Sequence, residues 1–271
     1  MPLSRSRSRP SLGRLIAVAM CITAGGTPLL AGAAPSASAR GAASDAAHCV
    51  DARRLDLTRV LAPPPAAGSA QQRAELDEML DIQARRSPAQ AERARLDAEV
   101  SVFRFADALD SPPQFTAARL PRTAALFRDL TADESAVMNA AKDRFARPRP
   151  FSVEPRLAPA VDKPASASYP SGHSTWAYAA GLVLADLVPE RRVQILARAE
   201  EYAHNRVVGG VHYPSDVQAG RLAGTALTAL LFRCAPFVKE EASARAELRA
   251  ALGSALAPEA GTTRLRQPLI P

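Results

Sequence analysis

The sequence contains little lysine, and most of its positive charge comes from arginine. Only three of the 34 basic residues in the 271-residue chain are lysines, and no lysine-rich block occurs anywhere. Residues 1–39 contain four arginines and no acidic residue, so the net charge of the chain without them is +3 and not +7. A surface charged this evenly gives no indication of nucleic-acid binding.

Histidine, cysteine and long apolar runs are also scarce. The chain has four His and three Cys without any Cys-x-x-Cys pair, so we expect no zinc site and no other metal site. Asp186 and Arg221 interrupt the two most apolar segments of the second half. Both segments are already shorter than the roughly 20 residues that a membrane helix needs. We therefore expect no membrane span in the mature chain.

The N-terminus has the composition of a secretory signal peptide. Four arginines precede an apolar stretch at residues 15–33, and Ala37-Ser38-Ala39 offers small residues for cleavage. A membrane anchor is a weaker alternative, because glycine and proline break the apolar stretch. A lipoprotein signal at Cys21 would need a smaller residue before the cysteine. We expect cleavage near Ala39 and a periplasmic or secreted protein.

Cleavage at that position would leave two cysteines, Cys49 and Cys234. They would reside in a compartment that permits oxidation, where an even number of cysteines favours pairing. We expect a disulfide between them, and two buried free thiols are the alternative.

Helical periodicity recurs from residue 71 onward, and no alternating strand pattern of useful length appears. Proline, glycine and capping residues bound the periodic segments. We expect helices over residues 71–86, 87–109, 123–128, 132–145, 174–187, 191–207, 215–233 and 238–252. Thr131 or Asp133 would cap the fourth of these helices. The pattern predicts an all-α fold, a single-domain helical bundle.

Proline-rich segments mark the limits of this domain. The sequence at 63–69 contains three prolines and a Gly-Ser pair, which exclude regular structure there. Residues 151–170 contain four prolines and read as a long loop, a kind of segment that is usually functional in a compact domain. The expected organisation is a signal peptide at 1–39, an N-terminal extension at 40–69, the helical domain at 70–252 and a C-terminal tail at 253–271.

Two cations lie close to a helix end in the middle of the chain. Lys142 falls in the last turn of the helix expected over 132–145, and Arg149 lies beyond Pro148, so the chain must turn back to bring the charges together. Neighbouring cations repel unless an anion lies between them. Phosphate suits both, because Arg offers a bidentate fork and Lys a point charge. Two solvated surface cations are the alternative for this cluster alone.

The sequence Pro170-Ser171-Gly172-His173 is typical of a helix N-terminus. Ser171 can cap the helix, Gly172 lets the backbone approach a ligand closely, and the free N–H groups and the helix dipole favour an anion. His173 would stand where a leaving-group oxygen needs a proton. A capped helix with a surface histidine is the alternative. We expect Trp176 in the core, the other interpretation being that it walls a ligand pocket.

A third cluster follows in the sequence. Arg206 closes one helix, and His212 directly precedes the next, which begins near Asp216. A carboxylate four residues after a histidine can hold one ring nitrogen and leave the other free for attack. It also stabilises the cation formed when that nitrogen bonds to phosphorus. The alternative is a histidine that merely caps the helix.

The order and spacing of these clusters resemble the three-part motif of the type 2 phosphatidic-acid-phosphatase and vanadium haloperoxidase superfamily: Lys142-x6-Arg149-Pro150, Pro170-Ser171-Gly172-His173 and Arg206-x5-His212-x3-Asp216. With Ser168-Tyr169 before the second block and a signal without membrane spans, the chain looks most like the bacterial class A non-specific acid phosphatases. The resemblance covers roughly residues 71–234. Asn205 stands where that family usually has Ser, and we expect this departure to tune activity without abolishing it.

The resemblance implies an acid phosphatase that hydrolyses small phosphomonoesters through a phosphohistidine intermediate. His212 would be the nucleophile, Asp216 the carboxylate that orients it, and His173 the general acid. The residues implied in binding the phosphate are Lys142, Arg149, Ser171, Gly172 and Arg206. The resemblance implies no cofactor and no metal, and similar enzymes are homo-oligomers.

Three other functions fit parts of the pattern. A vanadate-dependent haloperoxidase is the main alternative, because vanadate and phosphate are shaped alike, although chain size and the short loop between the first two motifs favour the phosphatase. A lipid or isoprenoid pyrophosphate phosphatase is disfavoured by the missing membrane helices. A binding protein without turnover would have no need for both histidines. A serine hydrolase is excluded, since no strand carries a nucleophile elbow.

Overall fold

The structure is a computed structural model and describes residues 49–253. The expected signal peptide, its cleavage site and all but the first residue of the expected tail lie outside the described residues. Every regular element within 49–253 is helical, so the all-α prediction is confirmed. The elements are α1 Leu57–Val60, α2 Ala70–Arg85, α3 Pro88–Leu96, η1 Val102–Leu109, α4 Pro121–Phe145, α5 Pro150–Val153, α6 Gly172–Leu187, η2 Pro189–Arg191, α7 Arg192–Val208, α8 Pro214–Leu231 and α9 Ala235–Leu252.

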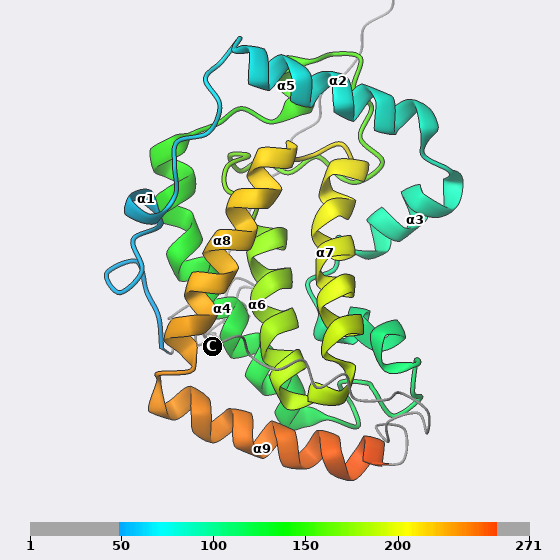
Figure 1. Cartoon of the computed structure of the whole chain (residues 1–271), viewed down its shortest axis with the longest axis vertical. Coiled ribbons are helices and arrows are strands. Elements are labelled where there is room, and N and C mark those ends of the chain that lie inside the picture. The colour runs from blue at the N-terminus through cyan, green and yellow to red at the C-terminus, as the bar shows by residue number, and fades with distance from the viewer. Residues whose placement is uncertain (1–48, 254–271) are drawn as a thin grey trace, which may run out of the picture. The chain divides into compact units, whose positions relative to one another are not determined.

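Helix α6 lies at the centre of this unit. It runs beside α7 and α8 and packs against α4, while α2 crosses one end of the group and α9 the other (Figure 1). The α6 sequence is apolar on all sides, and nearly all of its residues are buried, as expected of a helix surrounded by other helices. The first turn of α6 therefore lies next to the ends of neighbouring helices.

Two glycines allow α8 to approach α6 very closely. A Cβ atom at Gly220 would lie 2.6 Å from the Cβ of Ser174, and one at Gly224 would lie 2.3 Å from the carbonyl oxygen of Thr175. Any larger residue would push the helices apart. The contact also places the start of α8 against the start of α6, where the Ser171 N–H donates to the Asp216 carbonyl at 3.0 Å.

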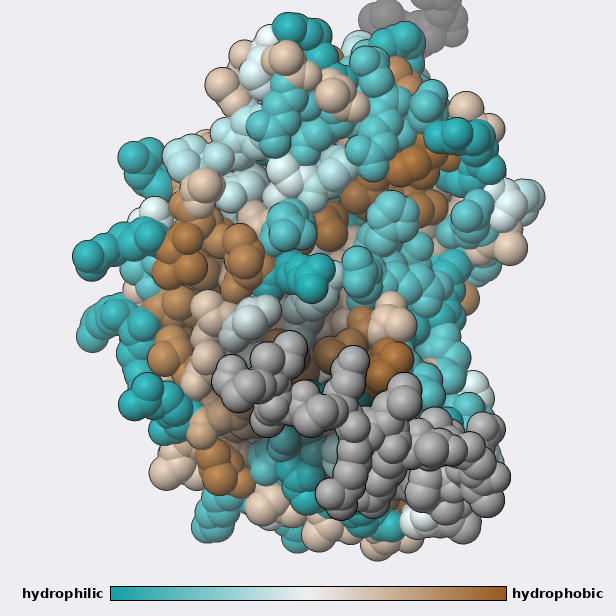
Figure 2. All heavy atoms as spheres, viewed as in Figure 1, coloured by the Kyte–Doolittle hydropathy of each residue, from teal (hydrophilic) through white to brown (hydrophobic). Residues whose placement is uncertain are grey.

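Polar and apolar surfaces are unevenly distributed on the face shown in Figure 2. Apolar surface gathers over α8, while polar residues cover much of the surface around it. Leu222 of α8 is 53% exposed. Among the described helices no single one is long and apolar enough to span a membrane, and α8 and α9 meet that test only when taken together across a bend of 94°.

The segment from 121 to 145 forms one helix, so the prediction of two helices with a cap at Thr131 or Asp133 is wrong. The Thr131 hydroxyl donates to the Phe127 carbonyl at 2.8 Å, a bond that a threonine inside a helix can make. Asp133 accepts hydrogen bonds from the backbone N–H groups of Cys49 and Val50. Both side chains thus have partners that keep them within a continuous helix.

The single helix expected over 87–109 is also wrong, because α3 ends at Leu96 and η1 begins at Val102. The carboxylate of Asp97, which is fully buried, binds Arg198 at 2.5 Å and Asn205 Nδ2 at 2.8 Å. These partners on α7 hold the chain in a turn at 97–101. The loop expected at 151–170 contains one helical turn at its start, in α5, and is otherwise irregular.

A disulfide joins Cys49 to Cys234, which precedes α9. The expected pairing is therefore confirmed. It links the first described residue to the far end of α8, 185 positions along the chain, and so closes a loop that contains all three motifs.

Replacing Cys49 and Cys234 together by serine should lower the free energy of unfolding, because the disulfide restricts the unfolded chain. A loss of about 2–5 kcal/mol is typical for a native disulfide. Urea unfolding of the protein without residues 1–39, with and without reductant, measures it. If the unreduced, denatured protein reacted with an alkylating reagent at both cysteines, the pairing would be wrong.

Candidate active site

The ends of three helices, α4, α7 and α8, meet beside the first turn of α6. Lys142, near the end of α4, donates from Nζ to the Pro170 carbonyl at 3.0 Å. Arg206, near the end of α7, accepts at its carbonyl from the Val211 N–H, and Asp216 lies in the first turn of α8. The structure therefore brings the three sequence clusters together in one place.

His212 and Asp216 are buried and in contact. His212 Nδ1 lies 3.2 Å from Asp216 Oδ2, and His212 Nε2 lies 2.8 Å from Arg149 Nη1. Because a carboxylate accepts and a guanidinium donates, this geometry assigns the ring proton to Nδ1 and a lone pair to Nε2. Burial lowers the pKa of His212 well below its usual value, with the Arg149 charge acting the same way and Asp216 opposing both. The ring thus carries its proton on Nδ1, and its Nε2 lone pair faces the Arg149 guanidinium.

Four donors surround the Asp216 carboxylate. Arg147 Nη1 binds Oδ1 at 2.6 Å, while the Ser168 hydroxyl at 2.5 Å, the Tyr213 N–H at 3.0 Å and His212 Nδ1 at 3.2 Å share Oδ2. Burial alone would raise the pKa of Asp216, but the hydrogen bond with His212 and the Arg147 charge bring it below its usual value. Asp216 stays ionised beside the histidine.

Arg147 was not among the residues identified from the sequence. Its Nη2 binds Glu75 of α2 at 2.8 Å, and its guanidinium lies 3.6 Å from the ring centroid of Tyr213. Glu75 in turn accepts the Ser215 N–H at 2.7 Å. A buried chain of charges, Glu75 to Arg147 to Asp216, therefore ties α2 to the start of α8. The partners are about 70 positions apart in sequence, so no local pattern shows the pairing.

Lys142 is a half-buried cation, and Arg149 is a buried one. Lys142 Nζ also donates to the Ala167 carbonyl at 2.7 Å, and Arg149 donates to the Ser166 and Val211 carbonyls, both at 2.8 Å. Burial lowers the pKa of Lys142 to about 8, and the Arg149 charge adds to the effect. Burial likewise lowers the pKa of Arg149 to about 10. An anion between these cations would relieve both effects.

Arg206 is the third cation and has donors without partners. It is 2% exposed, and its Nε and Nη1 atoms make no hydrogen bond with any residue in the range 49–253. Buried guanidinium donors are nearly always satisfied in folded proteins. Its charge lowers the pKa values of both Arg149 and His173, which places it near these groups. The free donors of Arg206 fit the oxygens of a bound anion.

His173 lies at the mouth of the site, in the first turn of α6. Its Nε2 is 3.1 Å from the Ala98 carbonyl, and its ring stacks on Tyr202 with centroids 6.4 Å apart. Burial lowers the pKa of His173 to about 3, and the charges of Arg206, Arg149 and Lys142 contribute in the same direction. Without an anion in the site His173 is neutral near neutral pH.

The start of α6 forms the remaining side of the site. Ser171 caps the helix, its hydroxyl accepting from the Ser174 N–H at 3.3 Å. A Cβ at Gly172 would lie 3.2 Å from Glu134 Oε1, an oxygen that has no hydrogen-bond partner in the described part of the chain. Burial raises the pKa of Glu134 to about 8, against the effect of Lys142. No sequence motif indicates this carboxyl beside the helix N-terminus.

Asn205 and His204 do not belong to the group of cations and histidines described above. Asn205, which replaces the usual serine, binds Asp97 and so supports the turn that carries Ala98, the partner of His173. His204 is exposed and lies outside the site. Across residues 49–253 no three His, Cys, Asp or Glu side chains lie close enough together to hold a metal ion.

The residues of this site lie within a region that matches a known protein family. Residues 130–240, which include every motif residue discussed above, match the model of the PAP2 superfamily. The chain contains a PAP2 superfamily domain. The matched region begins inside α4 and ends inside α9, so this PAP2 domain includes the whole set of cations and both site histidines.

Two curated relatives and one solved structure are among the proteins similar to the chain. An acid phosphatase of Zymomonas mobilis is 36% identical over 123 residues, which are 44% of this chain and 47% of that protein. A non-specific acid phosphatase of Providencia stuartii is 28% identical over 215 residues, 75% of this chain and 85% of that protein. A bacterial vanadium-dependent iodoperoxidase is superposed with a TM-score of 0.49 and 21% identity, covering 66% of this chain and 52% of that one. The chain thus spans about half the length of the first relative.

Removing the Arg147 charge should destabilise the PAP2 domain in a pH-dependent way. In Arg147→Met, Asp216 would be a buried charge without its guanidinium partner, which typically costs about 3–5 kcal/mol. The pKa of Asp216 would rise, so the variant would take up a proton as the pH falls, and its deficit in unfolding free energy relative to the wild type should shrink from pH 7 to pH 4.

Urea unfolding at both pH values measures this deficit. Arg144→Met is the matched control, because Arg144 is an exposed residue at the end of α4. An equal deficit for Arg147→Met at pH 7 and pH 4 would show that Arg147 acts by packing on Tyr213 and not by its charge.

Proposed function

We propose that this protein is an acid phosphatase that hydrolyses phosphomonoesters through a phosphohistidine on His212. One observation carries the proposal: an imidazole whose Nε2 lone pair faces a group of buried cations, one of which, Arg206, has donors without partners among residues 49–253. A nucleophile next to an anion-binding site is the arrangement that phosphoryl transfer requires. The similarity to two acid phosphatases supports the same reaction.

Binding would place the phosphoryl group among Lys142, Arg149, Arg206 and the free N–H groups at the start of α6. The guanidinium of Arg149 would turn from His212 Nε2 to a phosphate oxygen, which leaves the lone pair free to reach phosphorus. The three cations then neutralise the equatorial oxygens, where charge must be stabilised during transfer. Ser171 and Gly172 would contribute through the backbone.

In the first step His212 Nε2 forms a bond to phosphorus while the bond from phosphorus to the ester oxygen breaks. The imidazole becomes cationic, and Asp216, ionised and hydrogen-bonded to Nδ1, stabilises that cation. His173 gives a proton to the departing oxygen. In the second step a water molecule loses a proton to His173 and attacks phosphorus, the bond to Nε2 breaks, and inorganic phosphate leaves.

The general-acid role requires His173 to be protonated, although its pKa is about 3 in the free site. A bound phosphate would raise the pKa of His173, because its negative charge offsets the charges of the cations that lower this pKa. A phosphomonoester has its second pKa near 6, so its monoanion can bring the proton with it. On this account kcat/KM falls above about pH 6, because both the substrate proton and the protonated His173 are lost.

Location and assembly remain part of the same proposal. We propose a periplasmic or secreted enzyme, on the basis of the N-terminal composition at residues 1–39, acting on small phosphomonoesters. We also retain the proposal of a metal-free and cofactor-free reaction, and of a homo-oligomer as in similar enzymes.

The reaction itself is tested with p-nitrophenyl phosphate. We expect hydrolysis with an acidic optimum, competitive inhibition by inorganic phosphate and by vanadate, and no loss of activity in EDTA. If EDTA abolished turnover and zinc or magnesium restored it, the metal-free mechanism would be wrong. Halide oxidation by peroxide in the presence of vanadate, without phosphatase activity, would favour a haloperoxidase instead.

The two histidines should differ in their dependence on the leaving group. His212→Ala should abolish turnover, since no nucleophile remains. His173→Ala should lose about 10²- to 10⁴-fold on glycerol phosphate, which leaves as a basic alkoxide, and much less on p-nitrophenyl phosphate, which leaves as a stabilised phenolate. The His173 variant should also accumulate phosphohistidine if neutral imidazole activates the water of the second step.

His204→Ala serves as the matched control, because this histidine is exposed and outside the site. Rate measurements on both esters and a rapid quench into base, in which phosphohistidine survives, provide the readouts. Equal losses on the two esters in His173→Ala, with no trapped intermediate, would contradict the division of roles.

A further inference from the structure

The carboxylate of Glu75 joins helix α2 to the side of the candidate active site that lies behind His212. Its Oε2 atom accepts a hydrogen bond from Arg147 Nη2 at 2.8 Å, and its Oε1 atom accepts the N–H group of Ser215 at 2.7 Å. Ser215 lies in the first turn of α8, where a backbone N–H group has no partner within its own helix. The two oxygens of Glu75 therefore hold both Arg147 and the start of the helix that carries Asp216.

Glu75, Arg147 and Asp216 form a buried charge triad. Their side chains are 8%, 3% and 0% exposed. Arg147 Nη1 binds Asp216 Oδ1 at 2.6 Å and the Ser215 hydroxyl at 2.8 Å, while its guanidinium lies against the ring of Tyr213. Charges buried to this extent are screened little by solvent and salt. The triad therefore acts on its surroundings through the sum of its three charges.

The net charge of the triad determines how well it can stabilise a cation on His212. Two carboxylates and one guanidinium give it a net charge of −1. Asp216 lies 3.2 Å from His212 Nδ1, so this negative charge lies directly behind the ring. Without the charge of Glu75 the triad would be neutral, because Arg147 would offset Asp216.

Glu75 lies outside the region that matches the PAP2 superfamily, which covers residues 130–240. Arg147, Asp216 and His212 all lie within it. Helix α2 thus brings a charge to the back of the candidate nucleophile from outside the matched region.

We propose that Glu75 is a positioning residue for phosphoryl transfer, which keeps a net negative charge behind His212 while the ring becomes cationic. The inference rests on the proposed phosphohistidine mechanism, since it assigns a residue to the same site. Glu75 touches neither the substrate nor the nucleophile and acts through Arg147 and Asp216. It gains and loses no proton during the step in which Nε2 bonds to phosphorus and the ester bond breaks.

Glu75→Gln tests the proposal, because it removes the charge and keeps the size of the side chain. We expect kcat/KM for p-nitrophenyl phosphate to fall roughly ten- to hundredfold, the effect that loss of an outer partner typically has at metal-bound histidines. This parameter includes formation of the phosphohistidine, where the cation appears. Inhibition by inorganic phosphate should not weaken, because Lys142, Arg149 and Arg206 bind that anion. A kcat/KM within about twofold of the wild type, or a matching loss of phosphate affinity, would overturn the inference.

The double variant Glu75→Gln/Arg147→Met separates charge from structure. Removing both charges returns the net charge of the group to −1, so kcat/KM should be higher than in Glu75→Gln although two buried partners are lost. A purely structural role predicts that the double variant is at least as impaired as Glu75→Gln, and that result would overturn the inference. If the double variant does not fold, the comparison of kcat/KM with phosphate affinity in Glu75→Gln decides between the two.

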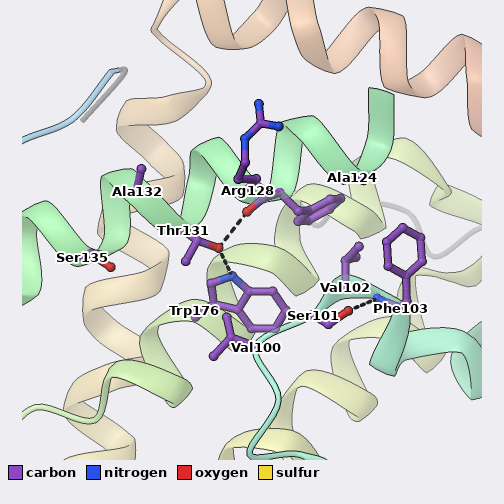
Figure 3. A pocket seen from close by; sticks show the side chains of 11 residues that line it. Val100, Ser101, Val102, Phe103, Ala124, Arg128, Thr131, Ala132, Ser135 and Trp176 are labelled. Carbon is purple, nitrogen blue, oxygen red and sulfur yellow. Dashed lines mark hydrogen bonds between the residues drawn. The ribbon is translucent and has the colours of Figure 1, made fainter. Parts of the chain in front are cut away.

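Two controls address charge removal elsewhere and general loss of stability. Glu78→Gln removes an exposed carboxylate one turn further along α2. Thr131→Val removes the 2.9 Å hydrogen bond from Trp176 Nε1 to Thr131 Oγ1, which joins α6 to α4 beside a cavity (Figure 3), and so destabilises the protein without changing the triad. Both variants should keep kcat/KM within about threefold of the wild type. A loss in Thr131→Val as large as that in Glu75→Gln would contradict the role of the charge.

Titration of the His212 ring by NMR distinguishes failure of this inference from failure of the proposed function, because it needs no turnover. The pKa of His212 should be lower in Glu75→Gln than in the wild type and higher in Arg147→Met, since the net charge behind the ring is zero, −1 and −2 in the three cases. The charges of Arg149 and Lys142, which lower this pKa, are the same in all three proteins. This order would support the inference even if no phosphomonoester were hydrolysed. Equal pKa values, or the reverse order, would overturn it even in an active phosphatase.

Discussion

A carboxylate withdrawn from water must be matched by donors, and the arrangement around Asp216 follows from this requirement. The four donors come from separate parts of the chain: Arg147 after α4, Ser168 before α6, and Tyr213 and His212 before α8. Each element must be in position before the charge is satisfied. Assembly of the site and folding of the domain are therefore coupled at one buried anion.

The positive charge of the site is not matched in the same way by residues 49–253. Lys142, Arg149 and Arg206 each have pKa values lowered first by burial, and Arg206 retains free donors. Keeping cations in this state costs stability, and an oxyanion bound between them would offset that cost. Such a site would bind an anion more tightly, because its cations are buried without a counter-charge before the anion arrives.

The sequence was sufficient for the fold class, the disulfide and the convergence of the three motifs, because periodicity, cysteine count and spacing are local or simple signals. It failed where distant partners decide the local structure. The sequence predicts a helix cap at Thr131, but its hydroxyl donates to the Phe127 carbonyl inside α4. Asp97 ends α3 because Arg198 and Asn205 hold it from about 100 positions away. The role of Arg147 was hidden for the same reason, since Glu75 lies on a helix with no motif of its own.

The bond between Cys49 and Cys234 makes the segment that carries all three motifs a covalent ring. A protease that cuts the exposed peptide bond between Asp162 and Lys163, within this ring, would open the ring without producing two separate molecules. Both sides of the cut would stay attached through the sulfur atoms, and the helices on either side would remain packed together. Nicking and loss of the site thus become separate events for this protein until a reductant is present.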